Sequence, residues 1–218
     1  MSSPIAFIFD MDGVLIDSNP FHKISLRQFC LKYGHDLNEQ QLREKIYGRT
    51  NKEWIVNVFG PMSHDQLMAY EHEKEALFRE LYQHDIKPVD GLIGFLDKLD
   101  EQQIPRAIGT SAPRVNVDFT LAKTHMEKYF SVILDEDFVT RGKPDPEIYL
   151  KVAAALNFDP GHCVVFEDSL SGVQAGKAAG CKVVGITTTH TPEELKDTDL
   201  VIDNFRDLDP KTLISRLF

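Results

Sequence analysis

The sequence has few of the features that would link it to a membrane, a nucleic acid or an oxidising compartment. No hydrophobic run is long enough to span a bilayer, and the first one, AFIF, is flanked by acids instead of a signal-peptide cleavage site. Lysine and arginine total 24 against 34 aspartates and glutamates, and the formal charge of −10 argues against broad contact with nucleic acid or anionic lipid. The three cysteines lie far apart, so they indicate neither a disulfide framework nor a zinc site and favour core packing in a reducing cytoplasm.

The sequence does contain enough apolar residues for a sizeable core. Of its 218 residues, 42% are hydrophobic, which suits one large domain or two small ones. We expect a monomer or a weak dimer with a small-molecule partner.

The most informative segment is FIFDMDGVLIDS, residues 7–18, in which an apolar run ends in two carboxylates two positions apart. Alternate side chains of an extended strand share a face, so Asp10 and Asp12 leave the strand on the same side, and Gly13 permits a tight turn after them. Crowded carboxylates favour a hard cation such as Mg²⁺. The same pattern also suits an Asp-rich turn that only ends a strand.

Three later segments also place chemistry at the end of a strand. RAIGTS, residues 106–111, ends in hydroxyls; GKPDPEIY, residues 142–149, places Lys143 before a helix; and CVVFEDS, residues 163–169, ends in Glu167 and Asp168. The carboxyl edge of an open parallel sheet is where ligands bind, so these segments are predicted to converge there.

This ordered set of segments resembles the four motifs of the haloacid dehalogenase superfamily. The segments DGVLIDS, GKPDPEIY and FEDSLSG are similar to the motif sequences of the branch that contains β-phosphoglucomutase and small sugar-phosphate phosphatases. The resemblance implies that Asp10 is a nucleophile that forms an aspartyl phosphate and that Asp12 is the general acid and base. It also implies that Asp10, the Asp12 main-chain carbonyl, Asp168 and Glu167 form a Mg²⁺ site, Glu167 directly or through water.

The resemblance gives the remaining motif residues roles around the transferred phosphoryl group. Thr110 and the backbone around Ser111 would bind its oxygens, and Lys143 would neutralise their charge. Outside the motif, these residue types also have ordinary structural roles. Asp12 suits a turn, Asp168 suits a helix N-cap, and a lone lysine is normally solvated.

The periodicity predicts an α/β fold with a helical insertion. Residues 1–17 and 89–218 would form a doubly wound parallel sheet with a Rossmann-like core, and residues 18–88 a small α-helical cap domain. Strands are expected near 105–109, 131–134, 162–166, 182–186 and 200–202, and the glycines at 172, 176 and 180 indicate close helix packing and an exit turn.

Within the expected cap, helix starts and faces can be assigned from the sequence. One helix should run from Ser18 to Gly34, and two others should begin at Thr50 and Ser63, which have Glu53 and Gln66 at capping-box spacing. The EHEKE run at 71–75 is expected to be a solvated helix face.

Substrate choice should come from this cap. His22 matches a histidine of the β-phosphoglucomutases, although it also suits a satisfied histidine on a helix stripe. Where those mutases place an arginine for the distal phosphate of a bisphosphate, this chain has Asn51. Arg49 lies two positions earlier and either compensates or is a solvated surface residue. The change from arginine to asparagine favours hydrolysis over phosphoryl return.

Three function classes therefore remain. The preferred one is a Mg²⁺-dependent phosphatase of a small phosphorylated metabolite, and the second is a β-phosphoglucomutase. The third, a non-enzymatic phosphate-binding module, is disfavoured because a stable phosphoacceptor needs no acid at Asp12. A dehalogenase is disfavoured because it should need neither the paired aspartate nor a Mg²⁺ site.

Overall fold

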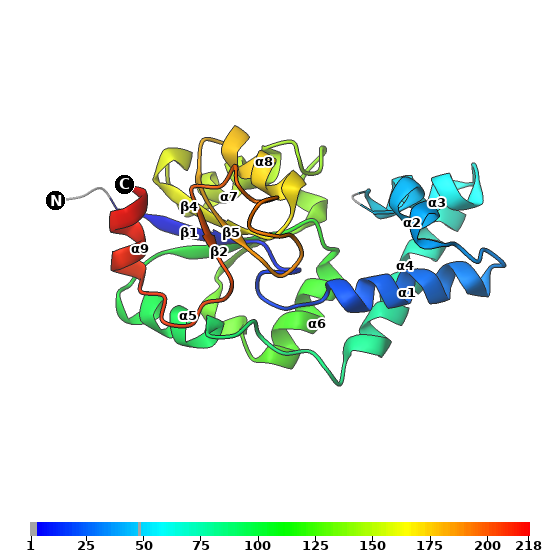
Figure 1. Cartoon of the computed structure of the whole chain (residues 1–218), viewed down its shortest axis with the longest axis horizontal. Coiled ribbons are helices and arrows are strands. Elements are labelled where there is room, and N and C mark those ends of the chain that lie inside the picture. The colour runs from blue at the N-terminus through cyan, green and yellow to red at the C-terminus, as the bar shows by residue number, and fades with distance from the viewer. Residues whose placement is uncertain (1–3, 48) are drawn as a thin grey trace. The chain divides into compact units, whose positions relative to one another are not determined.

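The computed structural model describes residues 4–47 and 49–218, which separate into two units (Figure 1). One unit contains the chain up to Asp17 together with Ile86–Phe218, and the other is Ser18–Asp85. The second boundary lies at 85/86 instead of the expected 88/89. The returning chain already belongs to the first unit before residue 89, because Pro88 forms a bridge with Ile16.

The first unit is built on one six-stranded sheet in which every neighbouring pair is parallel. Its order, β3-β2-β1-β4-β5-β6, places β1 at the centre, with the chain progressing outward in both directions. This is the predicted doubly wound sheet, and the switch in direction beside β1 marks the edge where ligands bind. The strands are β1 Ala6–Phe9, β2 Arg106–Gly109, β3 Val132–Leu134, β4 Cys163–Glu167, β5 Lys182–Ile186 and β6 Leu200–Ile202.

Helices cover both faces of this sheet, with α7 and α8 on one side and α5 and α9 on the other (Figure 1). Short 3₁₀ turns occupy Glu127–Tyr129, Glu136–Phe138 and Pro160–His162. Covered faces explain why the strands read as continuous apolar runs instead of alternating with polar residues. The helices are α5 Leu92–Glu101, α6 Arg114–Thr124, α7 Glu147–Leu156, α8 Leu170–Ala178 and α9 Pro210–Leu217.

The two faces of the sheet hold different cores. On the α5 side, aromatic rings pack together, and the rings of Phe9 and Phe166 stack with centroids 4.8 Å apart. On the α7 and α8 side the core is mainly aliphatic and includes Ile8 and Val165. Because side chains alternate along a strand, Glu167 lies on the same face as Val165, towards α7 and α8. The packing of β4 thus determines which way this acid points.

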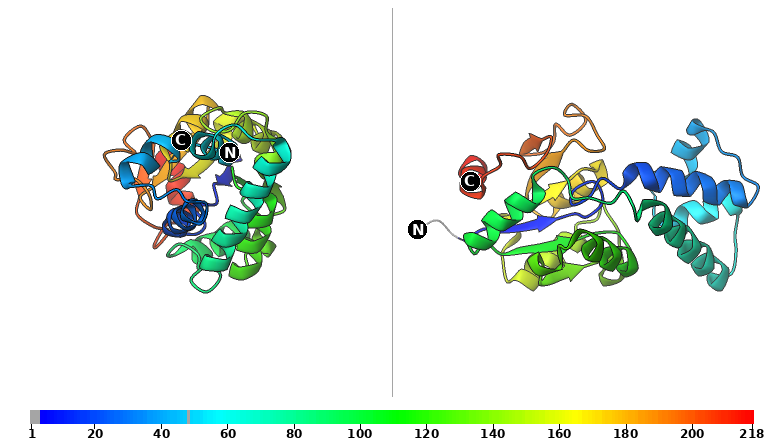
Figure 2. Two further views of the ribbon diagram at one scale, coloured as in Figure 1. Left: turned by 90° about the vertical axis from the view of Figure 1, so that its right-hand side faces the viewer. Right: turned by 90° about the horizontal axis from the view of Figure 1, so that it is seen from below.

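The second unit is helical, and its helix starts follow the sequence signals (Figure 2). Thr50 forms the predicted capping box with Glu53, and the Ser63 side chain accepts the Gln66 N–H. A further capping box, which was not predicted, begins α2 at Asn38. The helices are α1 Asn19–Lys32, α2 Glu39–Lys45, α3 Asn51–Phe59 and α4 His64–Tyr82.

The prediction that residues 71–75 form a solvated helix face is wrong for three of the five residues. Glu71, Lys74 and Glu75 are 4%, 3% and 4% exposed. They share a helical stripe with the buried rings of Phe78 and Tyr82, and α4 packs against both α1 and α3. The helical spacing of these three residues therefore indicates a buried face, although their charges favour a solvent-exposed one.

Among residues 4–47 and 49–218, no helix combines the length and the apolar character that crossing a bilayer requires.

Candidate active site

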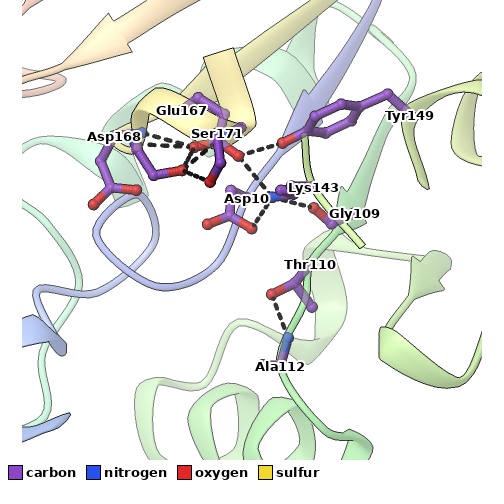
Figure 3. A network of polar contacts seen from close by, with 11 residues as sticks. Asp10, Gly109, Thr110, Ala112, Lys143, Tyr149, Glu167, Asp168 and Ser171 are labelled. Carbon is purple, nitrogen blue, oxygen red and sulfur yellow. Dashed lines mark hydrogen bonds and ion pairs between the residues drawn. The ribbon is translucent and has the colours of Figure 1, made fainter. Parts of the chain in front are cut away.

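Asp10 and Lys143 form the centre of a buried polar network at the carboxyl edge of the sheet (Figure 3). Asp10 follows β1 directly and is 7% exposed. The Lys143 ammonium donates to Asp10 Oδ1 at 2.7 Å and to Glu167 Oε1 at 2.6 Å, with its side chain 7% exposed. One buried cation therefore bridges carboxylates that lie more than 150 positions apart in the sequence.

Three carboxylates meet around this cation. Asp10, Glu167 and Asp168 are all buried, and each offers an oxygen within 4.8 Å of the others. The predicted convergence is thus found for the first and last motifs, because β1 and β4 are neighbours in the sheet and end at the same edge. The Thr189 hydroxyl, from the loop after β5, donates to Asp168 Oδ2.

Burial sets the protonation behaviour of this network. It raises the pKa of the Asp10 carboxyl to about 7, with Lys143 opposing the rise and Glu167 adding to it. Burial and the two neighbouring carboxylates also raise the pKa of Asp168 well above its usual value. Burial also disfavours the charged form of Glu167, but the ion pair with Lys143 and the hydrogen bonds from Tyr149 and the Ser169 N–H together outweigh it and lower the pKa of Glu167. Asp10 and Asp168 are therefore the acids that most need a further cation to stay ionised.

The other predicted residues of the first unit lie around this network. Thr110 follows β2, which pairs with β1, and its buried hydroxyl accepts the Ala112 N–H at 3.1 Å (Figure 3). Ser111 is exposed beside it, and Asp12 is half-buried two residues after Asp10. Asp12 is close enough for its charge to contribute to the raised pKa of Asp10.

The side chains of Tyr149 and Thr189 contact the acids, and the sequence analysis did not predict these contacts. The Tyr149 hydroxyl donates to Glu167 Oε1 at 2.6 Å, and Thr189 binds Asp168. Tyr149 belongs to the GKPDPEIY segment, six positions after Lys143, so its place in the motif was the available signal. Thr189 lies outside all four motifs, and only the position of its loop after a strand could have drawn attention to it.

The three residues predicted to bind substrate from the helical unit have partners within that unit. His22 Nδ1 lies 3.2 Å from Lys74 Nζ, and its ring stacks on Phe78 with centroids 3.8 Å apart. Asn51 donates to Glu75 Oε1 at 2.8 Å. Arg49 is exposed and donates to the Glu44 carbonyl at 3.0 Å. His22 and Asn51 thus contact the buried charged residues of α4, whereas Arg49 lies on the surface.

Comparison with known proteins identifies relatives along nearly the whole chain. The family model described as haloacid dehalogenase-like hydrolase matches residues 7–186. A phosphorylated carbohydrates phosphatase from Thermotoga maritima is 38% identical over 180 residues, which cover 80% of this chain and 81% of the relative.

Two solved structures show the same architecture. A HAD hydrolase of family IA, variant 3, from Entamoeba histolytica is 33% identical with a TM-score of 0.90, and the match covers 98% of this chain and 99% of the other. A β-phosphoglucomutase from Clostridium difficile is 27% identical with a TM-score of 0.82 and covers 99% of this chain and 97% of its own. Phosphatases and mutases thus both occur among similar proteins.

Proposed function

Because this chain belongs to the haloacid dehalogenase-like hydrolase family, we propose that it is a Mg²⁺-dependent phosphatase of a small phosphorylated metabolite, namely a sugar phosphate. The observation that carries the proposal is the buried Asp10 carboxylate, held by Lys143 at 2.7 Å beside two further buried acids. A phosphorylated carbohydrates phosphatase among the relatives supports a carbohydrate-like substrate.

In the proposed reaction, Asp10 is the nucleophile. One of its carboxylate oxygens forms a bond to phosphorus while the bond from phosphorus to the ester oxygen breaks, and Asp12 donates a proton to the departing alcohol. Water then attacks the phosphorus of the aspartyl phosphate as Asp12 takes its proton, which releases inorganic phosphate and restores Asp10. Lys143 fixes Asp10 Oδ1 and supplies positive charge beside the phosphoryl oxygens.

The donor set fits a magnesium ion. Three buried carboxylates and one ammonium leave two negative charges, which a divalent cation would balance, and the raised pKa values of Asp10 and Asp168 indicate that Lys143 alone does not compensate them. Asp10, Asp168 and the main-chain carbonyl of Asp12 would hold the ion, with Glu167 in direct contact or through water. The bound ion would supply positive charge to the phosphoryl oxygens. Carboxylate and carbonyl oxygens are the ligands that Mg²⁺ prefers.

Thr110 and Ser111 are proposed to bind the phosphoryl oxygens. Thr110 follows the strand beside β1, and its hydroxyl already accepts a hydrogen bond from Ala112 N, so its proton is available for a second partner. Ser111 is exposed at the same strand end, where a substrate can reach its backbone N–H. Backbone and hydroxyl donors of this kind stabilise developing charge without reorganising.

We propose that the helical unit acts as the substrate-selecting cap, with His22, Arg49 and Asn51 as its candidate substrate contacts. Its composition favours hydrolysis over a mutase reaction. Asn51 is bound to the buried Glu75 carboxylate and also accepts the Trp54 indole N–H at 2.9 Å. A neutral amide at this position supplies no positive charge for a second phosphate, which a bisphosphate-dependent mutase must hold.

The mutase remains the second candidate, because a β-phosphoglucomutase is among the similar structures. The two reactions differ only in whether water or a sugar hydroxyl accepts the phosphoryl group. We also propose that the protein acts as a monomer or weak dimer in a reducing cytoplasm, where its three buried cysteines stay unpaired.

Phosphorus NMR of the purified protein with Mg²⁺ and a panel of sugar phosphates tests the proposal. The panel includes β-glucose 1-phosphate with a trace of its 1,6-bisphosphate, and a parallel series contains EDTA. We expect inorganic phosphate as the product, and only with the metal present. Conversion to glucose 6-phosphate without phosphate release would instead establish the mutase.

A further inference from the structure

The carboxylate of Glu167 is fully occupied by hydrogen-bond donors of the protein. Oε1 accepts from Lys143 and from Tyr149, each at 2.6 Å. Oε2 accepts from the Asp168 N–H at 3.1 Å and from both the N–H and the hydroxyl of Ser169, at 3.1 and 3.0 Å. An ionised carboxylate has about four lone-pair sites, and five donors therefore leave no oxygen lone pair for a metal ion. Glu167 is 0% exposed, so solvent water does not compete for these hydrogen bonds.

Tyr149 contacts both members of the Lys143–Glu167 pair. Its hydroxyl shares Glu167 Oε1 with the Lys143 ammonium, and the centre of its ring lies 5.0 Å from the Lys143 nitrogen (Figure 3). The residue is fully buried on α7, which packs against β1, β2 and β3. Tyr149 thus links the position of the lysine to a helix that is fixed on the sheet.

Gly172 makes room for the Glu167 carboxylate. A Cβ at this glycine would lie 1.8 Å from Glu167 Oε1 and 1.9 Å from its carboxyl carbon. Only glycine fits at position 172, because any side chain there would clash with the Glu167 carboxylate. The first turn of α8 can therefore approach the carboxylate closely. Ser169 caps this helix by accepting the Gly172 N–H at 3.0 Å while donating to Glu167. The negative charge lies at the N-terminus of α8, where the helix dipole favours it.

We propose that Glu167 is the internal counter-ion that fixes Lys143 against Asp10 and is not a direct metal ligand, and that Tyr149 and Gly172 are positioning residues that hold Glu167 in place. The metal would then depend on Asp10 and Asp168. This assignment rests on the proposed function for the phosphate site, and it is tested by metal and phosphate binding, which do not depend on turnover.

Two binding measurements test the assignment. Mn²⁺ binding is followed by electron paramagnetic resonance without substrate, and inorganic phosphate binding by calorimetry with Mg²⁺ present. We expect Asp168→Asn to weaken Mn²⁺ binding by at least ~10-fold, whereas Glu167→Gln and Tyr149→Phe stay within about threefold of wild type. Both of these variants should weaken phosphate binding by about 10-fold, because the lysine is displaced.

A matched control removes a tyrosine hydroxyl from a carboxylate elsewhere in the same unit. Tyr129 donates to Asp97 Oδ1 at 2.5 Å and is 6% exposed. Tyr129→Phe should leave both binding constants within about twofold of wild type, since none of the hydrogen bonds described above for Asp10, Glu167 and Asp168 comes from Tyr129 or Asp97.

The outcomes separate this inference from the proposed function. If Glu167→Gln weakens Mn²⁺ binding as strongly as Asp168→Asn, then Glu167 is a metal ligand and the proposal is overturned. If Tyr149→Phe binds phosphate as tightly as wild type, Tyr149 has no positioning role. A wild-type protein that binds Mn²⁺ and phosphate as expected but hydrolyses no phosphate ester would disprove the phosphatase and leave the assignment of Glu167 standing.

Discussion

Both units of this protein bury charged side chains, but the two clusters are built differently. At the sheet edge, Glu167 accepts five hydrogen bonds, and Lys143 bridges it to Asp10. In the helical unit, Lys74 donates to Glu75 at 2.7 Å, but the buried Oε2 of Glu71 has no hydrogen-bond partner within residues 4–47 and 49–218. The first network surrounds Asp10, the proposed nucleophile, whereas the second leaves a buried polar atom unsatisfied by the described residues, which would cost stability.

The difference predicts that the charges at the sheet edge affect turnover, whereas those of the helical unit affect folding. Removing a group from the sheet-edge network should abolish chemistry while the apolar core on both faces of the sheet keeps the fold. Removing a group from the helical cluster should change the free energy of unfolding, because there the charges pack among three helices. The following variants test that contrast, from the largest expected effect to the smallest.

The largest effect is expected for Asp10→Asn. An amide cannot attack phosphorus as a carboxylate does, so we expect phosphate release to fall by about 10⁴-fold with an unchanged circular dichroism spectrum. Release is measured with the best substrate of the sugar-phosphate panel. Turnover within tenfold of wild type would eliminate the covalent mechanism.

Asp12→Ala should have the next largest effect. Loss of the acid and base is expected to lower kcat by about 10²- to 10³-fold, while Mn²⁺ still binds because the main-chain carbonyl remains. Asp36→Ala, which truncates an exposed aspartate of the helical unit, is the matched control and should retain wild-type kcat. Equal kcat values for the two variants would rule out the role of Asp12.

The helical cluster is tested by unfolding in urea. Lys74→Met leaves Glu75 buried without its cation and should destabilise the protein by about 3 kcal/mol. Glu71→Met removes the unsatisfied oxygen and should be neutral or stabilising by about 1 kcal/mol. Lys52→Met, at an exposed position of α3, should change stability by less than about 0.5 kcal/mol. A Lys74→Met variant as stable as the Lys52→Met control would contradict the contrast between the units.

The smallest effect concerns acid stability at the start of α7. Hydrogen bonds from Lys151 and from Thr140 lower the pKa of Glu147 from 4.5 to about 2. Because the folded pKa is depressed, this stabilisation is present above pH 4.5 and is lost as the pH falls towards 2. Glu147→Gln should therefore be less stable than wild type at neutral pH, with the difference shrinking between pH 4.5 and 2. A difference that does not vary with pH would show that the ionised form has no special role, and Glu101→Gln serves as the exposed control.

Most of the sheet-edge site could be predicted from the sequence because Asp10 follows β1, and Glu167 and Asp168 lie at the end of β4. Once the strands are parallel, their ends share one edge, and these three acids come together without knowledge of side-chain packing. Lys143 precedes α7 instead of following a strand, and only its motif indicated its place. The same logic gives no information about Tyr149, whose hydroxyl reaches Glu167 from a helix. That contact depends on how α7 lies on the sheet, which motif spacing does not specify.

In the helical unit, local features could be predicted from the sequence, but the burial of charged residues could not. Its caps at Thr50 and Ser63 were predictable because capping is a local interaction within four residues. The burial of Glu71, Lys74 and Glu75 was not, since charged residues are rarely buried and the covering helices are remote in sequence. The role of His22 and Asn51 in substrate choice stays a prediction.

Trapping the covalent intermediate would test the role of Asp10 without relying on a variant alone. Wild-type protein is mixed with Mg²⁺ and its best phosphate ester, quenched in acid within milliseconds and mapped by mass spectrometry after proteolysis. We predict one added phosphoryl group on the peptide that contains Asp10, absent from Asp10→Asn. Rapid phosphate release with no phosphorylated peptide, or with the group on another residue, would contradict the covalent mechanism.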